Sequence, residues 1–494
     1  MIPVDSNGTA ASAIKGSIYF LVMSWFSTGI NFLINILLAR ILFPEDFGIS
    51  SISFTVIGIF SMFIGFGLGP GVIQSQKEKD RLFSTFFFIE LATTILISSL
   101  IFGLSGIFAN IFMDSRIQLT IQVLTLYTFL LGFNSIPKTY LMKELQFKKV
   151  TIIESSSVIL NLISSLILAL LLKSYWSLIC GPIIAIIFRA FAYWISVPVF
   201  PKISKFDREI FRILIKFALP ILSASIVIFW ATHIDDMVVA QILGLTSLGL
   251  YSLAFKISNY LATLISHPIS TAMYPIYCKI QDDKIKLQAA FEQNYKRVLT
   301  ITVFITFYIL INAEFIISVL FGDKWLVSIP ILQILVFEGF LRSLASITGS
   351  VFQAINKYYW IFITSIIYLA IMAPIMIIST IYFGLFGTAI SVTIIYIPIF
   401  LISYLLLRKY IKFNILRDSI IRLLGAFLTI PPMLLILYYL IDYPLLILTF
   451  NLLVALAVYS LFVNYCTKGE FWKEIKDIIN IILKRENSKE NYRS

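Results

Sequence analysis

The sequence predicts an all-α, multi-spanning membrane protein with about fourteen membrane helices. Hydrophobic residues make up 59% of the 494 residues, and charged residues make up only 13%. So few charges could not cover the surface of a water-soluble domain, so most of that surface must face lipid. The apolar runs are continuous over about 20 residues, which is the length of a membrane helix. A transmembrane barrel would instead show alternating segments of about ten residues.

The apolar runs define the expected helices. They lie at roughly 15–42, 47–73, 83–110, 117–136, 150–172, 175–199, 213–234, 247–278, 298–321, 329–355, 359–381, 384–407, 421–441 and 444–466. Hydrocarbon cannot satisfy free backbone groups, so each run must be helical. An even number of spans places both termini on the same side of the membrane.

Lysine and arginine are concentrated on one side of this expected topology. Of the 38 basic residues, 31 lie in the two termini and the loops on their side, four lie on the opposite side, and three lie inside helices. Positive residues are concentrated in cytoplasmic loops, so we expect both termini in the cytoplasm. The net charge of +12 therefore records topology and does not imply a nucleic-acid partner.

The segment 39–54 recurs at 240–255 with a constant offset of 201, and glycine, serine and phenylalanine coincide within it. Both copies join the first and second helices of a set of six. Because six is even, the copies have the same orientation, as in parallel transporter repeats. The repeat predicts an N-lobe at 1–212, a C-lobe at 213–412, two further spans within 413–466, and a cytoplasmic segment at 467–494. That segment should form an amphipathic helix on the membrane surface, or dock on a partner protein.

Polar side chains at helical spacing mark helix faces that should point toward protein or water. Asn31 and Asn35 lie on one such face of the first helix. Asn259 and His267 lie on another, in the eighth helix. Such stripes also occur where helices only hydrogen-bond one another, so a purely structural role stays open.

Charged side chains inside the spans are stronger candidates for function. Lys256 has no acidic residue three or four positions away, so its partner must be another helix or an anionic ligand. Asp235 and Asp236 are the candidate partners on another helix. Glu338 and Arg342 are one turn apart, and this spacing predicts a self-neutralising pair.

Three further ionisable residues belong to this set. Arg189 has no acidic neighbour on its own helix and could extend toward the membrane surface. Glu90 lies about two turns inside the third helix without a local partner. His233 ends the seventh helix together with the two aspartates.

Nothing in the sequence indicates an enzyme, a metal site or a cofactor. The three cysteines are isolated, and the glycine-rich segment 65–71 lacks the Lys-Ser/Thr that follows a phosphate-binding loop. No set of nucleophile, base and orienting residue is present. Energy for transport would come from an ion gradient or from the substrate gradient.

Several stretches resemble the polysaccharide transporters, or lipid-linked oligosaccharide flippases, of the MATE-like (MOP) superfamily. They are similar to the branch that contains exopolysaccharide and teichuronic acid exporters. The matching stretches are 38–42 with 44–48, 67–69 with 72–74, 144–148, Asp235, 248–256, 274–275 and 320–325. The sequence departs from the family pattern at Phe43, where a glycine is usual, and at Asp236, where an asparagine is usual.

The resemblance implies a MATE-like pair of lobes around a central cavity. It also implies an undecaprenyl-diphosphate-linked sugar repeat unit as the substrate, moved from the cytoplasmic to the outer leaflet. Phosphate or acidic sugar would be held by Lys256, Arg342, Arg40 and Arg189, and sugar hydroxyls by Asn31, Asn35, Asn259 and His267. Coupling to H⁺ or Na⁺ would involve Asp235, Asp236, His233, Glu338 and Glu90. Membrane lipid and the polysaccharide polymerase machinery would be further partners.

Two other function classes are alternatives to this one. A MATE-type multidrug or cation antiporter should have an acidic cavity, whereas Arg189, Lys256 and Arg342 lie within the spans. A membrane glycan polymerase or ligase needs a sizeable outer loop for its catalytic residues, and the outer loops are very short.

Overall fold

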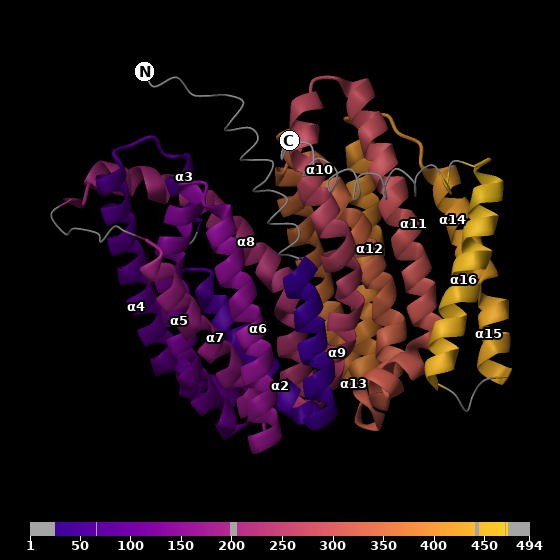
Figure 1. Cartoon of the computed structure of the whole chain (residues 1–494), viewed down its shortest axis with the longest axis horizontal. Coiled ribbons are helices and arrows are strands. Elements are labelled where there is room, and N and C mark those ends of the chain that lie inside the picture. Colours follow the sequence, from indigo (N-terminus) through magenta and orange to yellow (C-terminus); the bar gives the residue numbers. More distant parts are fainter. Residues whose placement is uncertain (1–24, 66, 198–204, 440–443, 470, 473–494) are drawn as a thin grey trace, which may run out of the picture. The chain divides into compact units, whose positions relative to one another are not determined.

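In a computed structural model, the structure describes residues 25–65, 67–197, 205–439, 444–469 and 471–472 (Figure 1). Within these ranges the regular structure is entirely helical. A first helix covers Trp25–Ile41. The others are α2 (Pro44–Ser61), α3 (Leu68–Gln74), α4 (Lys79–Ile111), α5 (Ser115–Lys143), α6 (Phe147–Leu172), α7 (Trp176–Ile195), α8 (Arg208–Leu243), α9 (Leu245–Tyr260), η2 (Leu261–Ser266), α10 (His267–Ile280), α11 (Lys284–Ile316), η3 (Ile317–Phe321), η4 (Asp323–Ser328), α12 (Ile329–Ala354), α13 (Tyr359–Arg408), α14 (Leu416–Leu428), α15 (Ile430–Tyr439) and α16 (Pro444–Cys466).

The predicted all-α membrane fold is confirmed. Eleven helical stretches of the described residues are long and apolar enough to cross a membrane. Two expected spans are not among these eleven: the described part of the first is shorter, and the second, expected at 47–73, is interrupted between Ser61 and Leu68, where α2 ends and α3 begins. The total of about fourteen spans therefore stays a prediction. The expected amphipathic segment at 467–494 lies almost entirely outside the described residues.

The 50-residue helix α13 contains two of the expected spans. As one straight helix it would measure about 75 Å, far more than the roughly 30 Å of hydrocarbon in a bilayer. Gly384 has φ 59°, which glycine adopts without strain, and breaks the helix. The hydroxyls of Thr380 and Thr388 lie 2.8 Å apart across this break. The two arms are therefore antiparallel, as expected for spans at 359–381 and 384–407.

By packing, the chain divides into two compact units. The first comprises Met1–Lys256, Phe321–Ile331 and Tyr358–Ile399, and the second comprises Ile257–Leu320, Leu332–Lys357 and Phe400–Ser494. The unit boundaries near residues 256 and 320 lie close to the π-helical turns η2 and η3. Such turns inside longer helices often mark functional positions. These boundaries differ from the expected lobe boundaries, and the division into repeat lobes stays a prediction.

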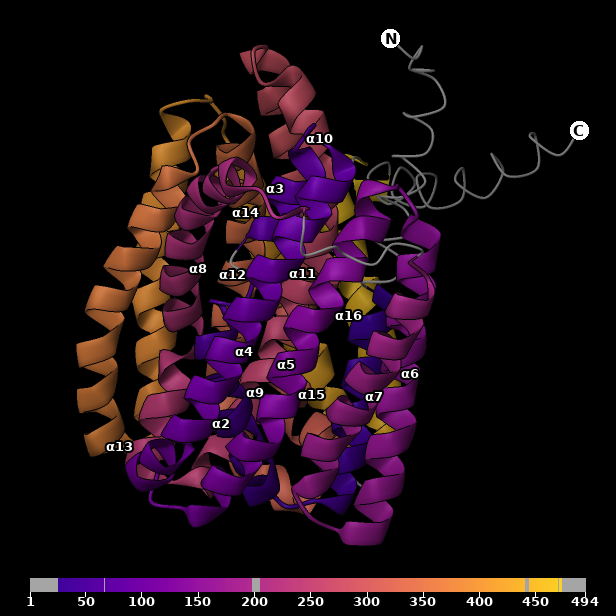
Figure 2. The same ribbon diagram turned by 90° about the vertical axis from the view of Figure 1, so that its left-hand side faces the viewer.

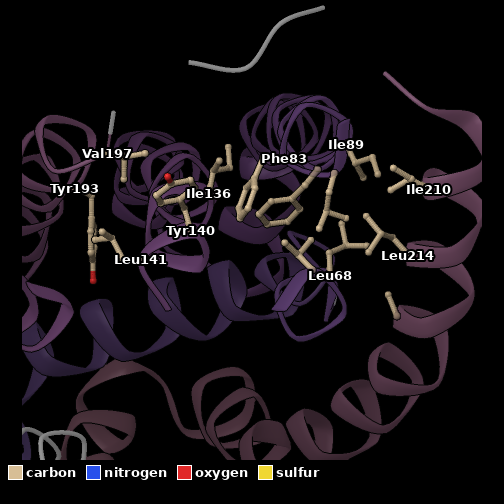
Figure 3. Packing of buried hydrophobic residues seen from close by; sticks show 14 of the residues in the cluster. Leu68, Phe83, Ile89, Ile136, Tyr140, Leu141, Tyr193, Val197, Ile210 and Leu214 are labelled. Carbon is tan, nitrogen blue, oxygen red and sulfur yellow. The ribbon is translucent and has the colours of Figure 1, made fainter. Parts of the chain in front are cut away.

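In the first unit, α4 packs on α5, and α6 packs on α7, while α5 also contacts α7 (Figure 2). The start of α8 packs on α3 and α4. Figure 3 shows Ile210 and Leu214 of α8 beside Leu68 and Ile89 in a buried apolar cluster. One face of the first turns of α8 is thus buried in the protein interior.

In the second unit, α14, α15 and α16 pack on α11 and on one another. Polar groups help to join them. Asn451 Nδ2 donates to Asn312 Oδ1 at 2.7 Å, and the fully buried Arg422 donates to Thr300 Oγ1 at 2.6 Å. In hydrocarbon, such hydrogen bonds are a main source of helix association beyond packing.

The two copies of the sequence repeat meet in the first unit. A Cβ built on Gly48 would lie 1.8 Å from the Leu245 carbonyl oxygen, and one built on Gly249 would lie 1.7 Å from the Pro44 carbonyl oxygen. Gly249 and Leu245 are the repeat equivalents of Gly48 and Pro44, at the offset of 201. The contact is therefore reciprocal, and α2 and α9 approach so closely only because both positions lack a side chain.

This contact yields a first prediction. Gly48→Ala and Gly249→Ala should each lower the free energy of unfolding by about 1–3 kcal/mol, because backbone must move to admit a methyl group. The measurement is the thermal unfolding midpoint of the detergent-purified protein, which should fall in both variants. Gly103→Ala is the matched control, since a Cβ there meets nothing within 4 Å. It should be neutral or mildly stabilising. Equal effects at Gly103 and Gly48 would contradict the assignment.

Candidate functional site

The first group of candidate residues lies near the end of α8, against α2 and α9. Asp235 is buried and accepts a hydrogen bond from the Tyr251 hydroxyl at 2.7 Å. Asp236 is also buried, and its Oδ2 lies 3.2 Å from Thr55 Oγ1 and 3.3 Å from His233 Nδ1. The two adjacent carboxylates thus have different partners, which is how one local sequence can hold two groups in distinct electrostatic environments.

Lys256 lies on α9 in the same unit and is partly buried. Its ammonium lies 5.8 Å from the centre of the Phe47 ring. No carboxylate of the described residues lies within 4 Å of it, so the expected ion pair with Asp235 or Asp236 is not formed. Asp236 nevertheless acts on Lys256 as the electrostatic neighbour of opposite sign. A cation with this environment can accept an anionic ligand without first breaking a salt bridge.

A second charged group joins α5, α6 and α7. Glu154 Oε1 accepts hydrogen bonds from Lys138 Nζ at 2.8 Å and from the Tyr193 hydroxyl at 2.7 Å. Glu154 Oε2 accepts one from Arg189 Nη1 at 3.0 Å. Two cations therefore share one buried carboxylate, which leaves a net charge of about +1 between these helices.

The members of this group lie at similar distances from the ends of their helices. Lys138, Glu154 and Arg189 lie five to seven residues from the ends of their helices at Lys143, Phe147 and Ile195. At 1.5 Å per residue, that is about 8–10 Å along each helix. The excess positive charge thus lies within about two turns of these helix ends.

The candidates in the second unit are arranged differently. Arg342 Nε donates to Glu338 Oε1 at 2.7 Å, so the pair predicted from their spacing is formed. Glu338 is fully buried. His267 is exposed and Asn259 is partly exposed. The structure thus brings Glu338 and Arg342 together as a neutralised pair.

The remaining candidates lie apart from these groups. Glu90 is 1% exposed, and a Cβ on Gly65 would lie 2.6 Å from its Oε1, so it packs against the chain between α2 and α3. Asn35 Nδ2 donates to the Asn31 carbonyl at 2.7 Å, along its own helix. Arg40 is exposed near the end of that helix.

Several polar contacts were not expected from the sequence. Lys138 follows Pro137, and the sequence predicts a helix that ends near 136, yet α5 continues to Lys143. Neighbouring helices allow proline within a membrane helix, so Lys138 lies on α5 and not in a loop. Thr55, Tyr193 and Tyr251 carry no distinguishing sequence signal, because each contacts a carboxylate on a different helix.

Lys324 and Trp325 have a further unexpected role. The Lys324 ammonium donates to the carbonyls of Arg40, Ile41 and Leu42 at 3.1, 3.3 and 2.9 Å. The Trp325 indole, which is fully buried, donates to the Ala39 carbonyl at 3.0 Å. The last carbonyls of a helix need donors, and a lysine is favourable there. The pair thus closes the end of the helix Trp25–Ile41.

Among the described residues, no group of three or more His, Cys, Asp or Glu side chains could hold a metal ion. The charged groups can bind anions and exchange protons. They do not form the arrangement of nucleophile and base that covalent catalysis needs.

Comparison with known proteins agrees with this architecture. Residues 37–330 match the model of a family described as polysaccharide biosynthesis protein. The lipopolysaccharide biosynthesis protein WzxC of Escherichia coli (strain K12) is 24% identical over 356 residues, which cover 69% of this chain and 70% of WzxC. The teichuronic acid biosynthesis protein TuaB of Bacillus subtilis (strain 168) is 23% identical over 302 residues, covering 60% of this chain and 62% of TuaB.

Solved structures show the same fold. The lipid II flippase MurJ in an inward closed conformation matches with a TM-score of 0.78 at 17% identity, over 91% of this chain and 99% of that one. An inward-facing multidrug resistance MATE family transporter of the MOP superfamily matches with a TM-score of 0.57 at 16% identity, over 80% and 95%. The MATE-like fold class and the family resemblance predicted from the sequence are therefore confirmed.

The Glu154 group yields a second prediction. Glu154→Ala should destabilise the purified protein by about 3–5 kcal/mol, because it leaves two partly buried cations without their shared carboxylate. Glu209→Ala is the control, since Glu209 forms an exposed ion pair with Lys77 at 2.9 Å. An exposed pair contributes at most about 1 kcal/mol. Thermal unfolding should separate the two variants, and similar midpoints would contradict the prediction.

Proposed function

Because the chain belongs to the family of polysaccharide biosynthesis proteins, we propose that it is a flippase for a lipid-linked oligosaccharide. It moves an undecaprenyl-diphosphate-linked repeat unit from the cytoplasmic to the outer leaflet by alternating access of its two lobes. The proposal is supported by a fold shared with the lipid II flippase and by relatives named for lipopolysaccharide and teichuronic acid biosynthesis.

Physical chemistry favours this substrate class. A glycan head group cannot cross hydrocarbon unaided, because each polar group that loses water without a partner costs several kcal/mol. A diphosphate needs cations, and lysine and arginine are its usual partners. The polyprenyl chain can remain in the bilayer while the head group crosses through the protein.

The observation that carries the proposal is Lys256, a membrane-embedded cation with no carboxylate of the described residues within 4 Å. Together with Arg189, Arg342 and Arg40, it would hold phosphate or acidic sugar. Asn31, Asn35, Asn259 and His267 would contact sugar hydroxyls. H⁺ or Na⁺ coupling would involve Asp235, Asp236, His233, Glu338 and Glu90.

The basic residues support a topology for this cycle. The side that carries 31 of the 38 basic residues should face the cytoplasm, and both termini lie on that side. The inner membrane of a prokaryote is then the site of action, and the polysaccharide polymerase machinery would receive the product on the outer side.

A multidrug antiporter is the alternative, since the MATE transporter structures share the fold. The in-helix cations Arg189, Lys256 and Arg342 argue against it, because a cavity that binds cationic drugs should be net acidic. Loss of the gene should therefore leave drug sensitivity unchanged and reduce surface glycan.

The decisive test is deletion of the gene followed by analysis of lipid-linked glycan in each leaflet. We expect undersized glycan-lipid to accumulate on the cytoplasmic leaflet, because synthesis continues while transfer stops. Complementation with the wild-type gene is the control. Normal glycan on the cell surface of the deletion strain, with no accumulated intermediate, would refute the proposal.

The site is tested separately by Lys256→Ala. Export should fall by about 10- to 100-fold, the value of one hydrogen bond to a charged group, with membrane insertion unchanged. Lys173→Ala is the matched control, since Lys173 is exposed at the end of α6. If the two single variants Lys256→Ala and Asp235→Ala both keep full export, these residues are not the site.

A further inference from the structure

The start of α8 carries a row of basic residues that the proposed transport site does not use. Arg208, Arg212 and Lys216 are spaced four residues apart, so they lie on one face of the helix. All three are exposed. None forms an ion pair within 4 Å with the described residues, although the neighbouring Glu209 is paired with Lys77.

The opposite face of the same helix is fixed in the protein interior. Ile210, Leu214 and Ala218 are buried, at 3%, 1% and 0% exposure. Figure 3 shows the first two of them within the apolar cluster. The basic row is therefore held outward by packing and does not rotate freely with the helix.

The basic face is also hollowed and partly apolar. A hollow of about 680 Å³ is lined by Phe211, Arg212, Ile215, Lys216, Leu219, Pro220 and Ser223. Pro220 has no backbone N–H, so it gives the Lys216 carbonyl no helical donor. The surface thus offers two cations, a hydrogen-bond acceptor and an apolar wall.

Arg208 is the first residue of α8, at the expected cytoplasmic end of a helix that is long and apolar enough to cross a membrane. Arg208 and Lys216 are about 12 Å apart along the axis. A headgroup layer is about 5–7 Å thick on each side of the hydrocarbon. If Arg208 lies at the membrane surface, the row crosses the headgroup layer and reaches about 5–7 Å into the hydrocarbon, from where Lys216 can extend its ammonium back outward.

We propose that Arg212 and Lys216, assisted by Arg208, form a binding site for the phosphate of an anionic membrane phospholipid on the expected cytoplasmic side. The headgroup phosphate is held by the two cations, a headgroup hydroxyl donates to the Lys216 carbonyl, and an acyl chain lies against Phe211, Ile215 and Leu219. Basic pockets of this kind on the cytoplasmic side bind anionic lipids. A bulk phospholipid fills such a surface site by mass action, because it far exceeds the lipid carrier in abundance. The site does not depend on the transport proposal.

The test uses the full-length protein, delipidated in detergent, and titrated with phosphatidylglycerol while bound lipid is counted by native mass spectrometry. Arg212→Ala/Lys216→Ala should weaken binding by about 30-fold, since each basic residue near an anionic headgroup contributes about 1 kcal/mol. Phosphatidylcholine should bind the wild-type protein and this variant equally weakly.

A matched control removes the same charge from the same side of the protein. Lys77→Ala/Lys205→Ala deletes two basic residues that are already paired, with Glu209 and Asp80. This variant should keep phosphatidylglycerol binding within about threefold of the wild type. If phosphatidylglycerol binding weakens equally in both double variants, the effect comes from net charge alone and the proposed site is wrong.

Two further measurements decide the remaining outcomes. Arg212→Lys/Lys216→Arg keeps the charges and should retain binding, and the single Gln variants should each lose about fivefold if the double Ala variant does not fold. Undecaprenyl phosphate should compete no better than phosphatidylglycerol. Displacement of phosphatidylglycerol by a small amount of undecaprenyl phosphate would assign the site to the carrier lipid and overturn the proposal.

Discussion

A polar or charged group inside hydrocarbon is costly unless it has a partner, and this constraint organises the molecule. Glu154 is held by Lys138, Arg189 and Tyr193, and so joins three helices through one carboxylate. Asp235 and Asp236 are held in the same way by hydroxyls and an imidazole from α2, α8 and α9. Lys256 stands apart from these groups because a phenylalanine ring, and not a carboxylate, lies beside it. A cation of this kind can bind a mobile anion, because no carboxylate already neutralises its charge.

Small residues decide how closely the repeats approach. The reciprocal contact of Gly48 and Gly249 with the opposite repeat places backbone against backbone, which no residue with a side chain allows. Beside it, Lys324 and Trp325 supply the hydrogen bonds that the end of the helix Trp25–Ile41 lacks. These contacts lie in the same unit as the α8 and α9 charges, so the packing that joins the repeats also sets the position of the candidate site.

The two basic features of the first unit have different physical roles. The Glu154 group keeps its excess charge between α5, α6 and α7, where two partly exposed cations share one buried carboxylate. The row on α8 is exposed, without ion pairs to the described residues, and held outward by the buried residues Ile210 and Leu214. The first feature is an ion-paired cluster between helices, whereas the second is an exposed row that fits the proposed phospholipid site.

The sequence by itself determined the membrane class, the helical spans, the charge asymmetry and the family. Hydrophobicity, length and charge are local properties of a segment, and they decide whether and in which orientation it crosses a membrane. It also predicted the Glu338–Arg342 pair, since both residues lie on one helix. Only the tertiary structure decided the other partners. Lys138 joins Glu154 because α5 continues past Pro137, and Lys256 lies beside Phe47 and not beside an aspartate because α2 packs against α9. Which residues on different helices become partners depends on the rotation and the axial position of each helix. Neither can be predicted from the residue spacing within a single segment.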